Sequence, residues 1–181
     1  ALAEEVRRME KSGELKNVPK MDYLVITLGA DWTGHANFLG SLADPAFDPE
    51  TFAGGARGAF EMILEAFAKG ELGGVKPILS PEVYANFAQA VKTRDEAGEK
   101  LENTLVGVRS AEIAEAYMDS RNAVVAVRLV SDQINGTRDR AGNVISGDPS
   151  AVTAVTDLWT FQRDTRARDP NWMLVATESV E

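Results

Sequence analysis

The sequence contains no cysteine, only one histidine and no long apolar run. Without cysteine, a disulfide framework and thiolate metal sites are excluded. The longest apolar stretch, residues 23–30, is far too short to span a membrane. The single histidine, His35, is predicted to be a polar surface residue. The sequence also lacks a His/carboxylate metal cluster, a phosphate-binding glycine loop and a G-x-S-x-G motif. These absences leave few recognised ways to build a catalytic site or to hold a cofactor, and we predict no cofactor.

Positive charge is also scarce, with 19 Lys and Arg against 28 Asp and Glu and a net charge of −9. A general nucleic-acid binder needs a basic footprint, so this class of partner is excluded. The charge is distributed unevenly along the chain. From Arg121 onward, seven arginines accompany eight acidic residues, a balance of −1, so the first 120 residues carry the remaining −8. The last third of the chain can therefore hold a local basic patch.

The length of 181 residues suits one domain with a short extension. We assign residues 1–43 to an N-terminal extension and residues 44–181 to the domain. In the extension, Leu2, Val6 and Met9 recur at helical spacing. Such a helix packs on a partner or caps a core, or it lies on lipid, and its acidic neighbours weaken the lipid alternative. Residues 21–42 contain no pattern that assigns them.

Two helices are predicted after the extension, over residues 48–70 and 80–98. Asp48-Pro49-Glu50 and Ser80-Pro81-Glu82 are both helix-start signals, because each combines a capping side chain, a proline in the first turn and an acidic residue near the helix N-terminus. Glycines at 70 and 98 mark the two ends. Glycines 54, 55 and 58 weaken the first half of the first helix, which indicates either close packing against another backbone or a looser start.

From Leu101 onward the apolar residues alternate with a period of two, which is typical of strands. Residues 101–118 are predicted as one long strand, or as two strands with a bend near Gly107 or Ser110. Residues 123–134 form a second strand, and a tight turn follows around residues 141–143. Residues 155–180 then form a two-stranded ribbon, with Trp159 and Phe161 on one face of its first strand, and Trp172, Leu174 and Ala176 on one face of its second.

Helices followed by four consecutive antiparallel strands define an α+β fold. Two amphipathic helices are what a strongly curved sheet needs to cover its concave face. We therefore predict a nuclear-transport-factor-two-like cone, with two to three helices packed on a curved four-stranded antiparallel sheet.

The sequence resembles the Tim44-like C-terminal domain family, and most closely the alphaproteobacterial inner-membrane relatives of that domain. The most specific segments are DLWTFQRD at 157–164 and RDPNWMLVATES at 168–179. Residues 47–70 resemble the first core helix of the family, residues 77–91 its second, and residues 130–149 its long hairpin arm. The resemblance covers about residues 44–179 and leaves the first 43 residues outside.

The resemblance implies a non-enzymatic tether or docking domain related to protein import and translocation. Mitochondrial members recruit the seventy-kilodalton chaperone to the translocation channel and contact cardiolipin-rich membrane. The implied partners are thus an anionic, cardiolipin-like membrane and a translocase or chaperone protein. The implied location is the cytoplasmic face of a bacterial inner membrane, or the matrix side of the mitochondrial one. A relative in the mitochondrial ribosome leaves a ribosome-docking module as an alternative.

Two sets of residues are candidate binding sites. Eight apolar residues either fill the core or line a pocket for an acyl chain or a hydrophobic peptide: Phe60, Ile63, Phe67, Tyr84, Phe87, Trp159, Phe161 and Leu174. Three arginines in and beside the ribbon loop either hold lipid phosphates or form weak ion pairs with Asp164 and Asp169: Arg163, Arg166 and Arg168.

An enzyme of the isomerase or dehydratase type is the remaining alternative, because cones of this kind host such chemistry. It needs an inward acid or base with a perturbed pKa. Asp157 shares a strand face with Trp159, and Tyr84 or Tyr117 is the candidate second group. We predict that the chain is not an enzyme.

Overall fold

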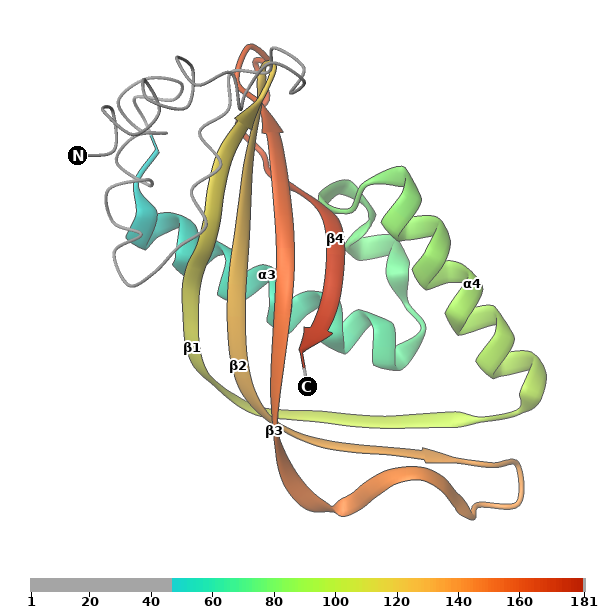
Figure 1. Ribbon diagram of the computed structural model, residues 1–181. Coiled ribbons are helices and arrows are strands. Elements are labelled where there is room, and N and C mark those ends of the chain that lie inside the picture. Colours follow the sequence, from blue (N-terminus) through green and yellow to red (C-terminus); the bar gives the residue numbers. More distant parts are fainter. Residues whose placement is uncertain (1–46, 181) are drawn as a thin grey trace, which may run out of the picture.

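The computed structural model describes residues 47–180, so the predicted extension and its amphipathic helix lie outside the described residues. Two α-helices come first, α3 (Pro49–Lys69) and α4 (Pro81–Ala97), joined by two 3₁₀ turns, η2 (Leu72–Gly74) and η3 (Lys76–Ile78). Four strands follow: β1 (Lys100–Asp119), β2 (Asn122–Arg138), β3 (Val144–Asp164) and β4 (Met173–Val180). They form one antiparallel sheet in the order β1-β2-β3-β4 (Figure 1). The predicted α+β class is confirmed.

Both helices begin and end where the sequence predicts. The Asp48 carboxylate accepts a hydrogen bond from the Thr51 backbone N–H at 2.8 Å, and Ser80 Oγ accepts one from Val83 N–H at 3.2 Å. These side chains satisfy backbone donors that a helix N-terminus leaves without partners. Gly70 and Gly98 end the helices at φ of 76° and 70°, a left-handed conformation that glycine adopts at no steric cost.

The three long strands are curved, and β1 is the most irregular of them. Its pairing with β2 shifts between Leu105 and Gly107, between Val108 and Ser110, and between Ile113 and Glu115. Such bulges bend a strand and increase its twist. The bend that the sequence predicts near Gly107 or Ser110 is therefore present, within one continuous strand.

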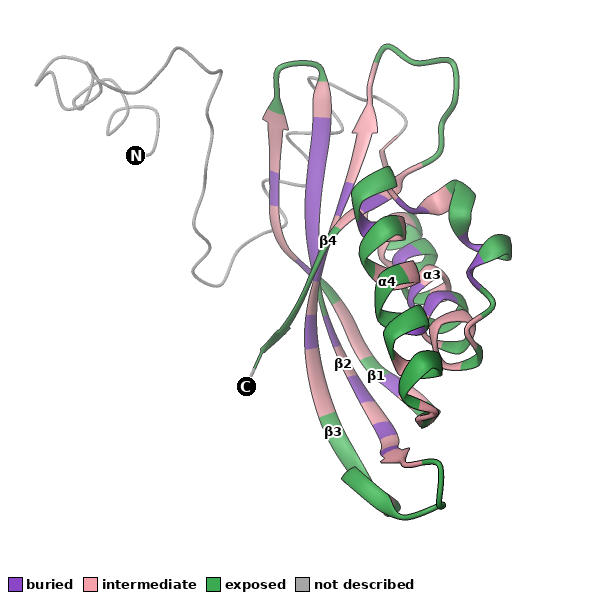
Figure 2. Cartoon of the chain, turned by 90° about the vertical axis from the view of Figure 1, so that its right-hand side faces the viewer, coloured by how far each residue is buried: buried purple, intermediate pink, exposed green. Residues whose placement is uncertain are grey.

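Both helices lie on the same side of the sheet, as the edge-on view shows (Figure 2). They cover the part of the sheet formed by the end of β1, the start of β2, the end of β3 and β4, and we call this part the core half. The remaining parts of β1, β2 and β3 continue beyond the helices as what we call the arm (Figures 1 and 2). The exposed turn of the β2–β3 hairpin forms the tip of the arm.

The arm contains more strand than the sequence predicts. We expected the second strand to end near residue 134 and the ribbon to begin near residue 155, but β2 continues to Arg138 and β3 begins at Val144. The predicted tight turn at 141–143 is confirmed, with Asp139 N–H donating to the Asn143 carbonyl at 2.9 Å. Gly147 has a φ of +71°, and a Cβ there would collide with the carbonyl oxygen of Asn135, so only glycine fits at this position.

The core lies between the helices and the core half. Phe60 and Ile63 of α3 are fully buried against Val125, Val127 and Leu129 of β2 and against the aromatic face of β3. Trp159 meets Phe60 edge-on, with ring centroids 4.8 Å apart. The predicted match between the helix stripe and the Trp159 and Phe161 face of β3 is thus confirmed.

The prediction for β4 is wrong in one respect. Leu174 faces the core opposite Phe161, but the pairing shifts at that point, so Thr177 lies opposite Trp159 and Ala176 opposite Thr160. Ala176 therefore lies on the other face from Leu174, because the extra residue Val175 breaks the two-residue period. Leu174 also forms an isolated parallel bridge with Leu79, and Ser80 N–H donates to the Leu174 carbonyl at 2.9 Å.

Candidate functional site: an apolar groove along α3

A groove of about 790 Å³ runs along α3 from its first residues to Glu65. Its other walls come from the end of β3 and from the residues just before β4, so it joins segments that are far apart in the sequence. Sixteen residues line it: Phe47, Asp48, Thr51, Phe52, Gly55, Ala56, Gly58, Ala59, Glu61, Met62, Glu65, Ile78, Phe161, Arg163, Asn171 and Trp172. Its volume lies within the range of about 300–1,000 Å³ that is typical of ligand pockets.

Four aromatic rings form one wall of the groove, with Phe52 at their centre. The Phe52 ring lies 4.8 Å from Trp172 and 5.9 Å from Phe161, both edge-on, and 5.4 Å from Phe47. Edge-to-face rings at these separations attract one another beyond their burial alone. The rings are therefore held in place and present a fixed apolar surface to the groove.

The wall formed by α3 is low because two glycines lie in it. A Cβ placed at Gly55 or Gly58 would have no atom within 4 Å in the described part of the chain. The close backbone packing that we considered for these glycines is therefore not found there. Each glycine costs a helix about 1 kcal/mol relative to alanine. At Gly55 and Gly58 the helix is therefore less stable than it would be with alanine, but the absence of a side chain widens the groove.

Acidic side chains outnumber basic ones along the groove. Asp48 caps α3, Glu61 and Glu65 lie within it, and Arg163 comes from the opposite wall. Glu61 pairs with Arg57 at 3.3 Å, and Glu65 pairs with Lys69, which lowers the pKa of the Glu65 carboxyl mainly through their hydrogen bond. The hydrogen bond from Thr51 likewise lowers the pKa of Asp48. Three carboxyl groups therefore lie along the α3 side of the groove, so this rim is acidic.

The three arginines predicted as a phosphate site do not converge on one point. Arg163 is half-buried in the groove wall, whereas Arg166 and Arg168 are exposed in the loop between β3 and β4. The sequence prediction missed Arg121, which pairs with Asp164 at 3.1 Å and accepts a hydrogen bond from Thr165 N–H at its carbonyl. Four arginines therefore lie at the end of the sheet where the groove opens.

The eight apolar residues predicted to fill the core or line a pocket mostly pack together. Phe60, Ile63, Trp159, Phe161 and Leu174 are buried in the core, and Phe67, Tyr84 and Phe87 pack against it. Of these eight, only Phe161 reaches the groove. The aromatic residues Phe47, Phe52 and Trp172 were missed as groove residues. A signal for Phe52 existed, because it lies eight residues before Phe60 on the same helical stripe.

The structure does not assemble the candidate catalytic pair. Asp157 is 7% exposed, and its carboxylate accepts a hydrogen bond from Ser179 Oγ at 2.8 Å. Within the described residues, neither Tyr84 nor Tyr117 hydrogen-bonds to Asp157. Tyr84 lies under the Lys76 ammonium, 5.0 Å from the ring centroid, and Tyr117 pairs with Val124 near the far end of β1. Between residues 47 and 180 there is also no cluster of three potential metal ligands.

No helix within residues 47–180 is both long and apolar enough to span a membrane. The described residues thus form an α+β domain with an aromatic groove along α3.

The sequence model of the Tim44-like domain matches residues 40–179, and the chain belongs to this family. The chain is 23% identical over 128 residues to the human mitochondrial import inner membrane translocase subunit TIM44, and equally so to the mouse and rat proteins. The match covers 70% of this chain but only 28% of each relative. The solved intermembrane space region of the chloroplast protein ARC6 aligns with a TM-score of 0.49 and 14% identity, over 74% of this chain and 96% of that one.

Proposed function

We propose that the chain is a non-enzymatic docking domain that works at an inner membrane, and that its groove receives a hydrophobic helix of a protein partner. The main observation behind this proposal is the aromatic wall of the groove, which lies opposite glycines of α3 that leave the groove wide. The relatives named as import translocase subunits support a translocase or chaperone partner. The same relatives support a location at the bacterial inner membrane or its mitochondrial counterpart.

The proposal includes the fold family and the domain boundaries. A curved antiparallel sheet with both helices on one side supports assignment to the nuclear-transport-factor-two-like cones. The match to residues 40–179 supports residues 44–181 as the domain and residues 1–43 as an extension. Proteins of one fold family differ widely in activity, so the functional argument rests on the groove.

The charges around the groove favour a partner helix with basic residues. Helix-in-groove recognition places the apolar face of an amphipathic helix against an apolar surface. Here Asp48, Glu61 and Glu65 rim the apolar surface. Lysines or arginines beside the apolar face of the partner would lie against these carboxylates, because the pairs of Glu61 with Arg57 and of Glu65 with Lys69 are exposed and weak. Such complementarity speeds association and excludes partners of the wrong charge.

Anionic lipid is the second proposed partner, at the arginine-bearing end of the sheet. Arg166 and Arg168 are exposed and form no ion pair within residues 47–180. The neighbouring carboxylates are already occupied: Asp164 pairs with Arg121 and accepts from Arg166 N–H, and Asp169 accepts from Asn171 N–H. These two guanidinium groups are therefore available for the phosphates of a cardiolipin-like surface.

The partner proposal is tested with a labelled amphipathic peptide of leucine and lysine, and an isomer in which glutamate replaces lysine. We expect the lysine peptide to bind at least about tenfold tighter, which corresponds to about 1.4 kcal/mol. Gly58→Leu fills the groove and should weaken binding by a similar factor. Gly54→Leu is the matched control, because Gly54 lies on α3 but does not line the groove. Equal binding of both peptides, or full binding to Gly58→Leu, contradicts the proposal.

The lipid proposal is tested by flotation with cardiolipin-containing vesicles. The double variant Arg166→Gln/Arg168→Gln should float less than the parent, and binding should fall with salt, since exposed charges are screened over about 10 Å at 0.1 M ionic strength. Lys92→Gln/Lys100→Gln removes the same charge near the opposite end of the helical layer and serves as the control. If both double variants float like the parent, the loop arginines hold no lipid, and docking to protein alone remains.

A further inference from the structure

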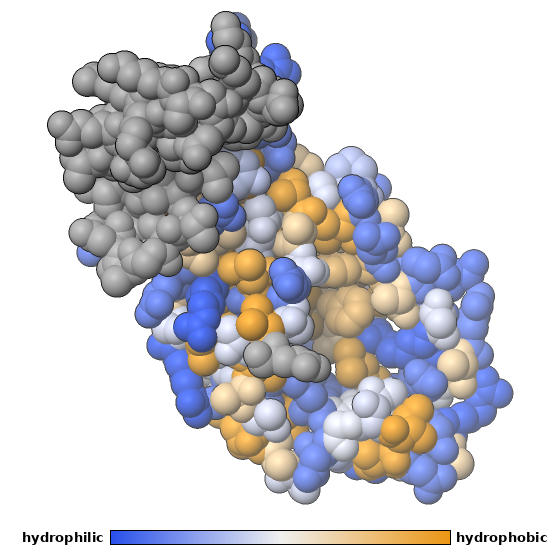
Figure 3. All heavy atoms as spheres, in the orientation of Figure 1, coloured by the Kyte–Doolittle hydropathy of each residue, from blue (hydrophilic) through white to orange (hydrophobic). Residues whose placement is uncertain are grey.

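A second, smaller cavity of about 260 Å³ lies on the core side of α3, away from the groove. It opens between the later turns of α3, the middle of α4, the end of β4 and the residues 157–159 of β3 that pair with it. The space-filling view shows the surface hollowed between β4 and α4, right of centre, with recessed atoms of hydrophobic colour (Figure 3). Pockets for drug-sized molecules occupy about 300–1,000 Å³, so this cavity suits a smaller group.

The charged group on the inner face of this cavity is the carboxylate of Asp157. The Asp157 side chain comes from the inner face of β3, and one of its oxygens accepts the hydrogen bond from Ser179 Oγ. The other carboxylate oxygen of Asp157 has no hydrogen-bond partner within residues 47–180. This oxygen is not fully buried, so a ligand in the cavity can contact it. Burial raises the pKa of this carboxyl, and the Ser179 hydrogen bond opposes that shift. Glu178 of β4 lies opposite Leu158, so its carboxylate is on the outer face of the sheet and Asp157 is the carboxylate on the cavity side.

Aromatic rings surround the Asp157 carboxylate. Trp159 lies two residues along the same strand face as Asp157, and Phe67 and Phe87 approach from the two helices with ring centroids 5.2 Å apart. The faces of such rings attract cations. No lysine, arginine or histidine of the described residues lines the cavity. Arg94 lies 5.5 Å from the Phe67 ring centroid and donates to the Phe67 and Ala68 carbonyl oxygens.

We propose that this cavity binds a small alkylated ammonium group, of which trimethylammonium is the best match. The methyl groups would contact Phe67, Phe87 and Trp159, and the positive charge would lie near the free oxygen of Asp157. A quaternary ammonium needs no hydrogen-bond acceptors, so aromatic faces and one carboxylate satisfy it fully. The bound cation would also compensate the buried carboxylate, which is otherwise costly to ionise in an apolar site.

The same geometry argues against a metal ion at this position. Calcium and magnesium take six or more oxygen ligands at short, regular distances. On its inner face this cavity offers one carboxylate, from Asp157, and two hydroxyls, from Ser179 and Thr177, among hydrocarbon rings. An anionic ligand is disfavoured by the Asp157 carboxylate. A neutral apolar ligand would fill the space but would leave the free Asp157 oxygen without a partner.

The experiment compares choline with its neutral isostere, 3,3-dimethylbutan-1-ol, in which a carbon replaces the nitrogen. Binding is followed by NMR at the indole N–H of Trp159, which is assigned with Trp159→Phe. We expect saturable shifts with choline, and affinity on the order of tenfold higher than for the alcohol. Equal affinity for the two compounds, or shifts that leave the Trp159 signal unmoved, overturns the proposal.

Variants connect the binding to named side chains. Asp157→Asn keeps the acceptor for Ser179 but removes the charge, so it should lower choline affinity to the level of the alcohol and leave alcohol binding unchanged. Asp119→Asn removes an exposed carboxylate at the end of β1 and should change neither affinity. Phe87→Leu keeps an apolar wall without the ring and should also weaken choline selectively. Full choline binding by folded Asp157→Asn overturns the proposal, as does full binding by Phe87→Leu.

Trimethylammonium groups occur both in free small molecules and in lipid headgroups. Flotation with phosphatidylcholine vesicles, with and without competing choline, separates the two sources. Choline-sensitive flotation assigns the headgroup, and choline binding without flotation assigns a free small molecule. The site is independent of the groove, so Gly58→Leu should leave choline affinity unchanged, whatever that variant does to peptide binding.

Discussion

The core half and the arm of the sheet share three strands but are stabilised differently. On the inner face of β2, Val125, Val127 and Leu129 lie in the core half, and Gln133 and Asn135 continue the same face into the arm. The change from valine and leucine to amides occurs at Ser131, within one strand and without a turn. The hydrogen-bonded ladder thus continues past the point where the helices stop covering the sheet.

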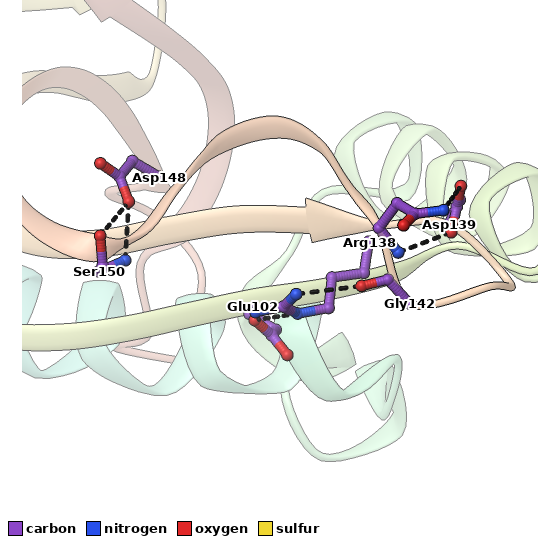
Figure 4. Close-up of polar contacts among 7 residues, drawn as sticks. Glu102, Arg138, Asp139, Gly142, Asp148 and Ser150 are labelled. Atoms are coloured by element: carbon purple, nitrogen blue, oxygen red, sulfur yellow. Dashed lines mark hydrogen bonds and ion pairs between the residues drawn. The ribbon is translucent and has the colours of Figure 1, made fainter.

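Side-chain polar contacts replace hydrophobic burial in the arm. The amide of Gln133 accepts from Asn103 Nδ2 at 2.9 Å and donates to Ser131 Oγ at 2.8 Å. Nearer the tip, Arg138 reaches Glu102 at 3.0 Å on β1 and the Gly142 carbonyl at 3.0 Å in the turn (Figure 4). A Cβ at Gly98 would collide with the Arg140 side chain, so the tip also contacts the end of α4. Since such contacts are individually weak, we expect mutations in the arm to lower the free energy of unfolding less than mutations in the core half.

The largest loss is expected in the core half, for Trp159→Ala. The Trp159 side chain is 4% exposed and packs on Phe60. Removing it should lower the free energy of unfolding by about 3–5 kcal/mol, because apolar burial is lost and a cavity remains. Chemical denaturation followed by circular dichroism measures the loss. A variant that unfolds within a degree or two of the parent on heating would mean that Trp159 contributes little to the core.

The largest loss in the arm is expected for Gln133→Ala. Gln133 is buried and bonded to Ser131, Asn103 and Asn135, so its removal leaves polar partners without their hydrogen bonds. We expect a cost of about 1–3 kcal/mol. Thr137→Ala, further along the same face of β2, is the control and should change stability little. If Gln133→Ala were as costly as Trp159→Ala, polar contacts would stabilise the arm as strongly as burial stabilises the core.

Two aspartates should respond to pH with opposite signs. Burial raises the pKa of Asp157 in the core half, whereas hydrogen bonds from Ser150 lower the pKa of Asp148 in the arm. Above its folded-state pKa, ionised Asp157 lowers stability, so Asp157→Asn should stabilise the protein at neutral pH. That gain should vanish once the pH falls below the ordinary carboxyl pKa of about 3.9.

Asp148→Asn should show the reverse behaviour. Ionised Asp148 contributes stability above the ordinary carboxyl pKa, and this contribution is lost as pH falls through the lower folded-state pKa. The variant should thus be less stable than the parent at neutral pH and equal to it in strong acid. Melting curves for both variants from pH 2.5 to 7 provide the measurement. If the melting temperatures of the two variants changed with pH in the same way, the two carboxyls would not have the different environments described here.

The smallest effect is expected for Arg138→Ala near the tip. The pair with Glu102 is about one-third exposed on each side, so its contribution should be at most about 1 kcal/mol. Adding 0.5 M salt should reduce the difference between parent and variant. If Arg138→Ala lowered the free energy of unfolding more than Gln133→Ala does, the contacts of Arg138 at the tip would be the main stabilising contacts of the arm.

Local chemistry made the helices predictable from the sequence. Asp48, Ser80, Gly70 and Gly98 act through atoms within a few residues of themselves, so the sequence places both helices to within about a residue. The α+β class follows from the change to a two-residue period after Leu101. The Trp159 face follows from the same period, because β3 is regular there.

Features that depend on distant partners were not predictable. The strands of the arm carry polar side chains on residues 135–150, so hydrophobic periodicity gives no signal, and their extent depends on pairing with the neighbouring strand. The bulge at Val175 reverses the face of β4 without a proline or glycine to mark it. The groove joins Phe47, Phe52, Phe161 and Trp172 from three separate segments, and a period within one segment does not reveal such a meeting.

The bridge between Leu79 and Leu174 has a consequence for the order of folding. The strands follow one another as hairpins, so each can pair with its sequence neighbour after closing a short loop. The bridge instead joins positions 79 and 174, a separation of 95 residues, and it ties the start of α4 to the last strand. Because closing so long a loop costs more conformational entropy, we expect this bridge to form late in folding, after β4 has joined the sheet. Hydrogen exchange at the Ser80 amide should consequently follow the opening of β4 rather than that of α4.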